Sequence, residues 1–450
     1  MSSDLEARAR AILGLNDLEA VPNALPIRVE RMWRKENFAP IIPYTGSLVI
    51  SLGHAPDLGV WQESIAAVTR RHDVLHSRLG LVNNRAVLLP ATPQRADLAV
   101  VKVSRSDIEN HHHRPSALSE FFGTSMNLFE EPGFRCRAFR DEDDNVSLGI
   151  LMHHYVGDAW STQILRREIK AVHAALAGAT APDFQPVAQY SDYALSQRRA
   201  LAKNLPAQLD YWHRQLAGAR PTELPFDRSG DPDRQGRAFF FLPTEILEKL
   251  TALSRAERIS LSIISLAAFQ RALAIWCGQN HAVAAVTSAD RIAPRFRDTV
   301  GRLIAGIPMA SDFSMDMPVR EFLKALARQF YDTIPHWDLA FEQYDEIFSP
   351  APPFCPTRFN FIPHQAEFAT GGDGGTRPEF SGVLRLTDTG RGEGYSDMLF
   401  ILMQYPDGLL GRITHSLNFS PEKIKAFIAI FSRILEKIAG NPGGKLSELL

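Results

Sequence analysis

The stretch Met152-His153-His154-Tyr155-Val156-Gly157-Asp158-Ala159-Trp160-Ser161 joins the two clearest local patterns in this chain of 450 residues. Before it, from Val146 onward, apolar residues alternate with a period of two, which predicts a strand with one buried face. After it, Asp158–Ala177 carries apolar residues at helical spacing, which predicts an amphipathic helix ended by Gly178. The stretch is therefore predicted to be a short loop between a strand and a helix.

Two side chains in this loop are candidates for chemistry. If the parity of the strand continues, His154 points toward the buried face with Met152, and His153 points away. Asp158 follows His154 by four residues, at the start of the helix. A histidine at a strand end near a carboxylate can act as a general base, because its unperturbed pKa lies near neutral pH. Two structural readings stay open: Asp158 is placed as a helix N-cap, and His154 as a hydrogen-bonded core histidine.

Elsewhere in the chain, strand and helix patterns alternate, which favours α/β layers. Helices are predicted over Leu58–Arg71, after the N-cap residue Ser260, and over Pro421–Gly440. Within Gly178–Lys203, alanine, proline and polar residues replace the periodic apolar ones. We therefore expect a boundary between two domains there.

The composition argues against several classes of function. Lys and Arg number 49 and Asp and Glu 51, so the net charge of -2 gives no overall attraction to nucleic acid or anionic lipid. The three isolated cysteines, Cys136, Cys277 and Cys355, offer neither a disulfide framework nor a metal site. The N-terminus lacks the apolar segment of a signal peptide, and the longest apolar run, 260–276, is interrupted by polar residues. We expect a cytoplasmic protein that binds no nucleic acid and no membrane.

Three other features are expected to carry no chemistry. His111–His113 lacks partner ligands at the spacing of a tetrahedral site, so we expect a solvated loop there. The glycine-rich stretch 369–378 is predicted to be a mobile loop. Ser161 is predicted to be a first-turn helix residue, because its surroundings match no nucleophile elbow.

His153-His154-x-x-x-Asp158 resembles the HHxxxDG signature of the condensation domains of nonribosomal peptide synthetases, which have the chloramphenicol acetyltransferase-like fold. Five further stretches resemble motifs of that family, in the same order, and the similarity covers about residues 25 to 450. One match would be weak, but six in register are a specific signal. The five are Arg71–Leu79 (RHExLRTxF), Tyr190–Arg198 (YxDYAxWQR), Tyr211–Arg228 (YWxxxLAG…LPxDRP), His336–Glu342 (HQDxPFE) and Arg358–Phe361 (MFNY strand).

The resemblance implies a fold and a division of the chain. It implies two chloramphenicol acetyltransferase-like lobes of mixed α/β structure, which form a V around a central tunnel. The N-terminal lobe is expected at residues 25–200, and the C-terminal lobe at 201–450 with a crossover loop near 365–395. Residues 1–24 are then an N-terminal extension, whose predicted helix Asp4–Leu13 leaves room for a docking segment.

The resemblance also implies the roles of the candidate site residues. His154 matches the catalytic histidine of the family, which deprotonates or orients the nucleophile. Asp158 matches a structural aspartate that pairs with an arginine of the second lobe, and Arg291 occupies the position of that arginine. A solvated arginine in a basic loop remains the alternative for Arg291. His153 is expected to support the loop by hydrogen bonding, and Gly157 to lie beside the reacting carbonyl group.

The chain departs from the family pattern at two positions near these residues. Ala159 stands where the motif has glycine, and its methyl group is expected to narrow the passage to His154. Val300–Pro308 resembles IGxFVNTLP, but Ala305 replaces the asparagine. The N-terminal SxxQ pattern is not recognisable around Leu25–Trp33. These changes bear on the choice of substrate more than on the class of reaction.

We therefore expect a free-standing condensation enzyme, since no adenylation domain and no carrier serine motif is recognisable. It is predicted to transfer a polyketide or peptidyl thioester from the phosphopantetheine arm of a carrier protein to an amine or hydroxyl acceptor, with no cofactor and no metal of its own. Chain release in natural-product biosynthesis is the favoured role. The alternatives are an acyl-CoA-dependent HxxxD acyltransferase, an epimerising relative, and a catalytically silent module that recruits carrier proteins.

Overall fold

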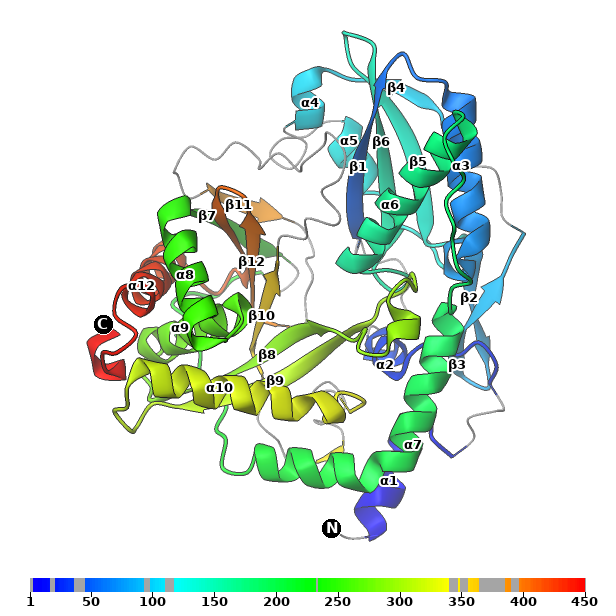
Figure 1. The fold of residues 1–450 in the computed structure, drawn as a ribbon. Helices are drawn as coiled ribbons and strands as arrows, with labels where there is room; N and C mark the ends of the chain where they lie inside the picture. Colours follow the sequence, from blue (N-terminus) through cyan, green and yellow to red (C-terminus); the bar gives the residue numbers. More distant parts are fainter. Residues whose placement is uncertain are drawn as a thin grey trace.

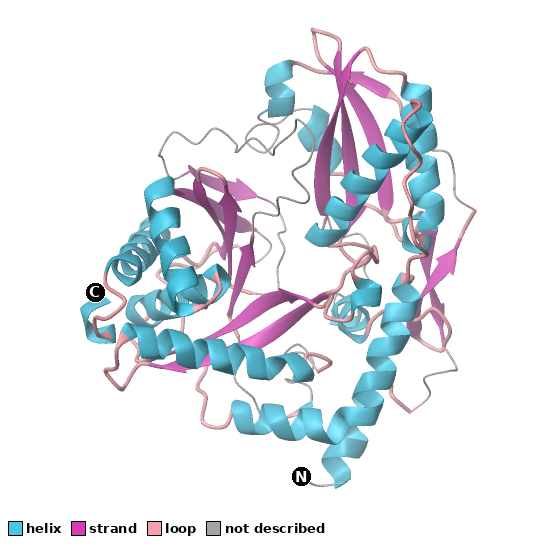
Figure 2. Ribbon diagram, in the orientation of Figure 1, coloured by secondary structure: helices cyan, strands magenta, loops and turns pink. Residues whose placement is uncertain are grey.

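Two large β-sheets, each with its own helices, divide the chain into two lobes (Figure 1, Figure 2). The lobes meet near α2 (Ile27–Lys35) and diverge from it, which gives a V (Figure 1). The mixed α/β fold in two lobes predicted above is therefore confirmed. The computed structural model describes residues 3–16, 21–35, 45–92, 98–109, 117–231, 234–339, 347–348, 355–363, 385–389 and 396–449.

The N-terminal lobe is built on a four-stranded sheet in the order β1-β6-β5-β4. The central strand β6 (Asn145–His153) pairs antiparallel with both neighbours and is buried from Val146 to His153. The predicted strand is thus confirmed, but both of its faces are covered. The other elements are β1 (Thr45–His54), α3 (Leu58–Arg71), η1 (Asp73–His76), β2 (Ser77–Val82), β3 (Arg85–Pro90), β4 (Val100–Lys102), α4 (Arg105–Glu109), α5 (Ala117–Phe122), β5 (Phe134–Arg140) and α6 (Ala159–Leu176).

The C-terminal lobe contains a seven-stranded mixed sheet in the order β11-β7-β13-β12-β10-β8-β9. Strand β10 (Thr357–Ile362) lies between β12 and β8 and pairs parallel with both, and the remaining pairs are antiparallel. The other elements are β7 (Gln235–Pro243), α8 (Thr244–Glu257), α9 (Leu261–Trp276), β8 (His281–Ala289), η2 (Pro294–Phe296), β9 (Ile304–Asp312), α10 (Val319–Thr333), η3 (Ile334–His336), β11 (Arg385–Thr389), β12 (Met398–Tyr405), β13 (Gly408–Ser416), α12 (Pro421–Gly440) and η5 (Leu446–Leu449).

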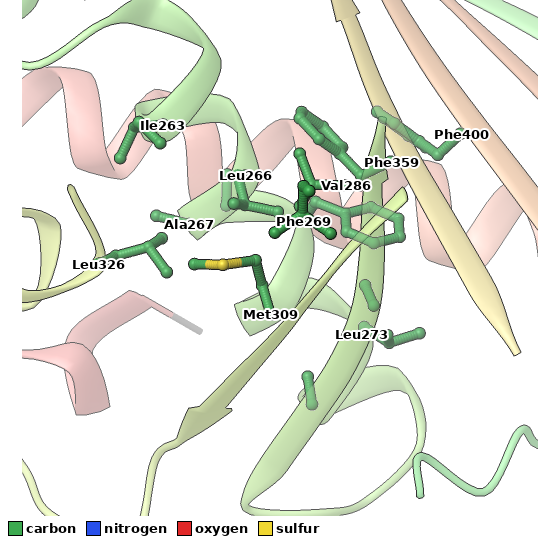
Figure 3. Packing of buried hydrophobic residues seen from close by; sticks show 14 of the residues in the cluster. Ile263, Leu266, Ala267, Phe269, Leu273, Val286, Met309, Leu326, Phe359 and Phe400 are labelled. Atoms are coloured by element: carbon green, nitrogen blue, oxygen red, sulfur yellow. The ribbon is translucent and has the colours of Figure 1, made fainter. Parts of the chain in front are cut away.

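Helix α9 forms the centre of this lobe, against β8 and β10 and between three other helices. It begins at the predicted N-cap, since the Ser260 side chain accepts a hydrogen bond from the N–H of Ile263. In the core shown in Figure 3, the Phe269 ring lies 5.4 Å from Phe359 and 5.1 Å from Phe400. Tilted aromatic pairs of this kind add about 0.5–1.5 kcal/mol each to the burial of their area.

The long helix α7 (Tyr190–Gln215) runs through the predicted boundary at residues 200/201 and packs in both lobes. Tyr190 and Tyr193 lie in the core of the N-terminal lobe, and Leu205 and Trp212 lie in the core of the C-terminal lobe. The predicted boundary segment 178–203 is irregular only as far as residue 189. The lobes are therefore joined by a continuous helix where the sequence indicated a loose connection.

The helical spacing of α7 is hidden in the sequence because polar residues occupy buried positions. Gln197 is 4% exposed, and its Oε1 accepts a hydrogen bond from the N–H of Ile27 at 3.1 Å. Arg198 is 2% exposed and donates to the carbonyl of Leu25 at 2.6 Å and to the carboxylate of Glu30. Buried polar groups of this kind are tolerated only when they are hydrogen-bonded.

The N-terminal helix α1 (Ser3–Leu13) is part of the core of the C-terminal lobe. Ala9 is fully buried and Leu13 is 3% exposed, and Arg10 donates a hydrogen bond to the carbonyl of Ala202 in α7 at 3.0 Å. The apolar face of this helix is therefore covered by its own chain, and a docking role for the rest of the segment stays a prediction.

Three expectations fall on residues outside the described ranges. Within the crossover near 365–395, only the backbone of β11 is described, and the glycine-rich stretch and the histidine run 111–113 lie outside. No single helix among the described residues is long and apolar enough to cross a membrane. Helices α8 and α9 meet the length and composition criteria only as a pair bent by 110°.

Candidate active site

The chain turns directly after β6, and this turn carries both histidines of the motif. The strand ends at His153, and a hydrogen bond of 3.0 Å from the N–H of Val156 to the carbonyl of His153 closes the turn. The parity expected for the two rings stays a prediction, because both faces of β6 are covered and His154 lies beyond the strand: His153 is 1% exposed and His154 is half-buried. The alternation of side chains stops where the extended backbone stops.

His153 holds the turn from inside. Its Nδ1 accepts a hydrogen bond from the N–H of Tyr155 at 3.1 Å, and its backbone N–H donates to the carbonyl of Gly133 at 2.8 Å. The rings of His153 and Tyr155 meet edge to face, with centroids 4.8 Å apart. Because Nδ1 accepts, a neutral His153 carries its proton on Nε2.

His154 is held in the opposite tautomer. Its Nδ1 lies 3.0 Å from the carbonyl oxygen of Gly157. A carbonyl oxygen only accepts hydrogen bonds, so Nδ1 carries the proton, and in the neutral ring the lone pair is on Nε2. Burial, followed by the positive charge of Arg302, lowers the pKa of His154 to about 3, against the raising effects of Asp158 and the Gly157 carbonyl. His154 is thus neutral at pH 7, and Nε2 can accept a hydrogen bond or a proton.

Gly157 is required for packing within the turn. A Cβ atom at this position would overlap Sδ and Cε of Met152, the last apolar residue of β6. The glycine therefore lets the returning chain lie directly on Met152 and place its carbonyl beside His154. Whether Gly157 also lies beside a reacting carbonyl group stays a prediction from the resemblance.

Asp158 is both the N-cap of α6 and half of an ion pair that joins the two lobes. Its Oδ1 accepts from the N–H and the hydroxyl of Ser161, both at 2.8 Å. Arg291 donates to Oδ2 at 2.8 Å and to Oδ1 at 3.1 Å, and the N–H of Leu303 donates to Oδ2 at 3.0 Å. Burial alone would raise the pKa of Asp158, but Arg291 and Ser161 outweigh it, so the pKa lies below its usual value. Asp158 is therefore an ionised, fully occupied structural carboxylate.

Arg291 reaches Asp158 because the connection between β8 and β9 crosses from one lobe to the other. Phe296, Val300 and Leu303 of this connection are buried in the core of the N-terminal lobe, although both flanking strands belong to the C-terminal sheet. The guanidinium of Arg291 also donates to the carbonyl of Thr299 at 3.1 Å. The alternative of a solvated arginine is thus excluded by the structure.

The sequence did not predict the part that Ser161 takes in this contact. Its hydroxyl is fully buried, lies 2.9 Å from the carbonyl of Gly301, and accepts a hydrogen bond from the N–H of Gly301 at 3.1 Å. A Cβ on Gly301 would overlap the Tyr190 ring, so only glycine lets the two segments approach this closely. No local pattern signals this role, because the partners lie 140 residues apart in the chain.

The two departures from the family pattern lie in different surroundings. Ala159 is exposed in the first turn of α6, beside the motif. Ala305 is 1% exposed in β9, where its backbone pairs with Ser288 of β8.

No group of three or more metal-ligating side chains occurs among the described residues. The central tunnel and the passage to His154 stay predictions.

The sequence profile of the condensation domain family matches residues 30–351, well over half of the chain, and the chain belongs to that family. It is 27% identical over 430 residues to the nonribosomal peptide synthetase TES of Alternaria alternata, a match that covers 92% of this chain and 8% of that protein. The chain spans less than a tenth of the length of the first curated relatives that it matches.

Solved structures have the same fold. The X-domain from teicoplanin biosynthesis, solved in complex with OxyB, matches with a TM-score of 0.75 and 20% identity over 96% of this chain and 97% of that one. The condensation domain that mediates chain release from the enacyloxin polyketide synthase matches with a TM-score of 0.74 and 18% identity over 97% of this chain and 86% of that one. At these identities the likeness concerns the fold alone.

Proposed function

We propose that this chain transfers an acyl group from the phosphopantetheine thioester of a carrier protein to an amine or hydroxyl acceptor. The observation that carries the proposal is the 3.0 Å contact between Nδ1 of His154 and the carbonyl oxygen of Gly157, from which we infer that the neutral ring bears its lone pair on Nε2. Asp158 is occupied by Arg291 and Ser161, so it orients the turn and takes no part in proton transfer.

The reaction needs no group beyond the two substrates and this turn. The acceptor nitrogen or oxygen attacks the thioester carbon, the C–S bond breaks, and an amide or ester forms. The acceptor loses one proton, and the phosphopantetheine sulfur gains one. General-base assistance is typically worth about 10²–10⁴-fold. Since a pKa near 3 makes His154 a weak base, its hydrogen bond serves to orient the nucleophile and to pass its proton as the C–S bond breaks.

Chain release is the role we favour for this reaction, in which the acceptor is a small amine or alcohol and the product leaves its carrier. The condensation domain of the enacyloxin synthase, which has the same fold, mediates chain release. The departures at Ala159 and Ala305 fit a substrate choice that differs from that of peptide-elongating relatives.

The test is mass spectrometry of a phosphopantetheinyl carrier protein loaded with a simple acyl group and incubated with this protein and a panel of amines and alcohols. We expect the acyl mass to leave the carrier and an amide or ester to form, and His154→Ala to stop both. His54→Ala is the matched control, because His54 is exposed and pairs with Asn145, at the other end of β6. Transfer from acyl-CoA but not from the carrier would instead indicate an acyl-CoA-dependent acyltransferase. Racemisation of the tethered group without an acceptor would indicate an epimerising enzyme.

A silent recruitment module is the second candidate, and two observations favour it. The X-domain, which shares the fold, was solved in complex with another protein, OxyB, and the low pKa of His154 makes it a weak base. Such a module would leave the acyl group on its carrier with every acceptor. It would still retain the loaded carrier in a pull-down, and His154→Ala would retain it equally well.

A further inference from the structure

The connection between β8 and β9 carries a second buried arginine, Arg302, beside the site. Arg302 is 5% exposed, and its Nε is buried without a hydrogen-bond partner. Its backbone carbonyl accepts from the hydroxyl of Tyr190 at 3.4 Å. Among the residues that the structure describes, its guanidinium makes no hydrogen bond and no ion pair.

Four other buried arginines of the described chain pair with carboxylates. Arg291 pairs with Asp158, Arg28 pairs with Asp290, and both Arg85 and Arg198 pair with Glu30. A guanidinium buried without a counter-ion is costly, because its charge loses the solvation of water and gains no partner. Arg302 therefore differs from these four arginines, since no anion pairs with it among the described residues.

The neighbours of Arg302 in the chain fix its position beside the catalytic turn. The N–H of Gly301 donates to the Ser161 hydroxyl, and the N–H of Leu303 donates to Asp158. The charge of Arg302 acts on the His154 ring, on which Asp158 also acts. Asp158 does not neutralise Arg302, because both of its oxygens are already occupied by Arg291, Ser161 and the backbone of Leu303.

The missing anion is best supplied by a substrate. A guanidinium binds a carboxylate through two parallel hydrogen bonds, which fixes both the position and the orientation of the bound group. A donor on a carrier protein is already held by its phosphopantetheine arm. A small acceptor in solution has only the site to hold it, so a bidentate contact close to His154 would place its nucleophile for attack.

We propose that Arg302 binds the carboxylate of the acceptor, and that the acceptor is a free amino or hydroxy acid. This inference rests on the proposed acyl transfer and names the class of its second substrate. A carboxyl group that is bound to Arg302 as an anion is not esterified to a carrier. The acceptor therefore arrives untethered, and the step that consumes the carrier-bound chain releases it as an amide or ester with a free carboxylate.

The experiment compares acceptors in pairs: glycine, β-alanine and 3-aminobenzoate, each beside its amide. For every pair, KM and kcat are measured with an acyl-loaded carrier, and equilibrium binding to the protein alone is followed by saturation-transfer NMR. The variants are Arg302→Met, Arg302→Lys and Arg295→Met, the last an exposed arginine of the same connection that serves as the matched control.

We expect the wild-type protein and Arg295→Met to prefer at least one carboxylate over its amide by ~10-fold or more in KM, since a site built for a polar group discriminates strongly against analogues that lack it. Arg302→Met is expected to lose this preference with little change for the amides, and Arg302→Lys to recover part of it. Arg302→Met is also expected to raise the pKa of the His154 ring, which NMR measures without acyl transfer.

Two results would overturn the inference. In one, amides and carboxylates bind and react equally well in the wild-type protein. In the other, Arg302→Met lowers kcat for both members of each pair without changing KM. This result would indicate that Arg302 stabilises the oxyanion that forms during the reaction and does not bind the acceptor carboxylate. If no acyl transfer occurs at all, the proposed function fails, but selective binding of carboxylates by NMR still decides whether Arg302 is their site.

Discussion

Arg291 and Asp158 are 133 residues apart in the chain, yet their side chains form a bidentate ion pair with distances of 2.8 and 3.1 Å. The pair joins the connection between β8 and β9 to the first turn of α6, and so fixes the turn that carries His154 to the other lobe. Its side chains are 3% and 2% exposed, which makes it a buried contact between lobes.

Loss of either partner of this pair is expected to be costly. Arg291→Ala or Asp158→Ala should destabilise the protein by about 3–5 kcal/mol, because each leaves an uncompensated buried charge. The double variant should cost less than the sum of the two, with a coupling of about 0.5–3 kcal/mol. Urea unfolding measures all four forms, and Arg214→Ala, which breaks the exposed pair with Asp210, should change stability by less than about 1 kcal/mol. Strict additivity would show that the contact does not form.

His154 should contribute to the pH dependence of the unfolding free energy. The folded protein keeps this ring neutral down to a pKa of about 3, whereas the unfolded chain takes up the proton near pH 6.5. Between these values the unfolded state binds more protons, so stability falls as the pH falls through this window. The loss in unfolding free energy between pH 7.5 and 4.5 should be smaller in His154→Ala than in wild type, with His54→Ala unchanged.

Asp158 affects the stability of the protein at lower pH than His154 does. Its folded pKa is depressed, so its contribution is complete above about pH 4 and is lost only as the pH falls below that value. The comparison between pH 7.5 and 4.5 therefore reports on His154 with little contribution from Asp158. An identical acid loss in wild type and His154→Ala would mean that the ring is solvated.

The close packing of Gly157 on Met152 gives a third prediction. Gly157→Ala should lower stability and activity together, since the added methyl group overlaps the Met152 side chain and displaces the turn. Met152→Ala alone should cost about 2–5 kcal/mol, because it leaves a cavity in the core. The double variant Gly157→Ala/Met152→Ala should be more stable than the sum of the single changes predicts. Thermal denaturation checks this prediction. A fully additive loss of stability would show that the added methyl group does not contact the Met152 side chain.

A fourth prediction concerns α1. Ala9→Asp should destabilise the protein by several kcal/mol, because it buries a carboxylate without a partner in the core of the C-terminal lobe. Ala7→Asp is the matched control on the exposed face of the same helix and should have little effect. Equal stability of the two variants in urea unfolding would show that Ala9 is not packed in the core and that α1 is free to act as a docking segment.

Local patterns in the sequence predict the centre of the site well. The strand before the turn, the N-cap at Asp158 and the N-cap at Ser260 each depend on local sequence, and each is present in the structure. The resemblance to condensation domains adds the partner of Asp158, which no local pattern could supply.

Contacts between distant segments were not predictable in this way. The roles of Ser161 and Arg302 depend on how the β8–β9 connection inserts into the other lobe. The continuous helix from residue 190 through 203 was not predictable, because Gln197 and Arg198 are buried by partners more than 160 residues away. Hydrophobic periodicity does not register polar residues that are buried in this manner.

The most direct test of acyl transfer at His154 is a single-turnover rate. This is the rate at which an acyl-loaded carrier protein loses its acyl group to a saturating acceptor. It is measured for wild type and His154→Ala by intact-protein mass spectrometry. We expect a rate at least about 10²-fold lower in His154→Ala, the lower end of the range for general-base assistance, with unchanged carrier binding and unchanged stability at pH 7.5. Equal rates in the two proteins would contradict this expectation and would leave the turn after β6 with a structural role only.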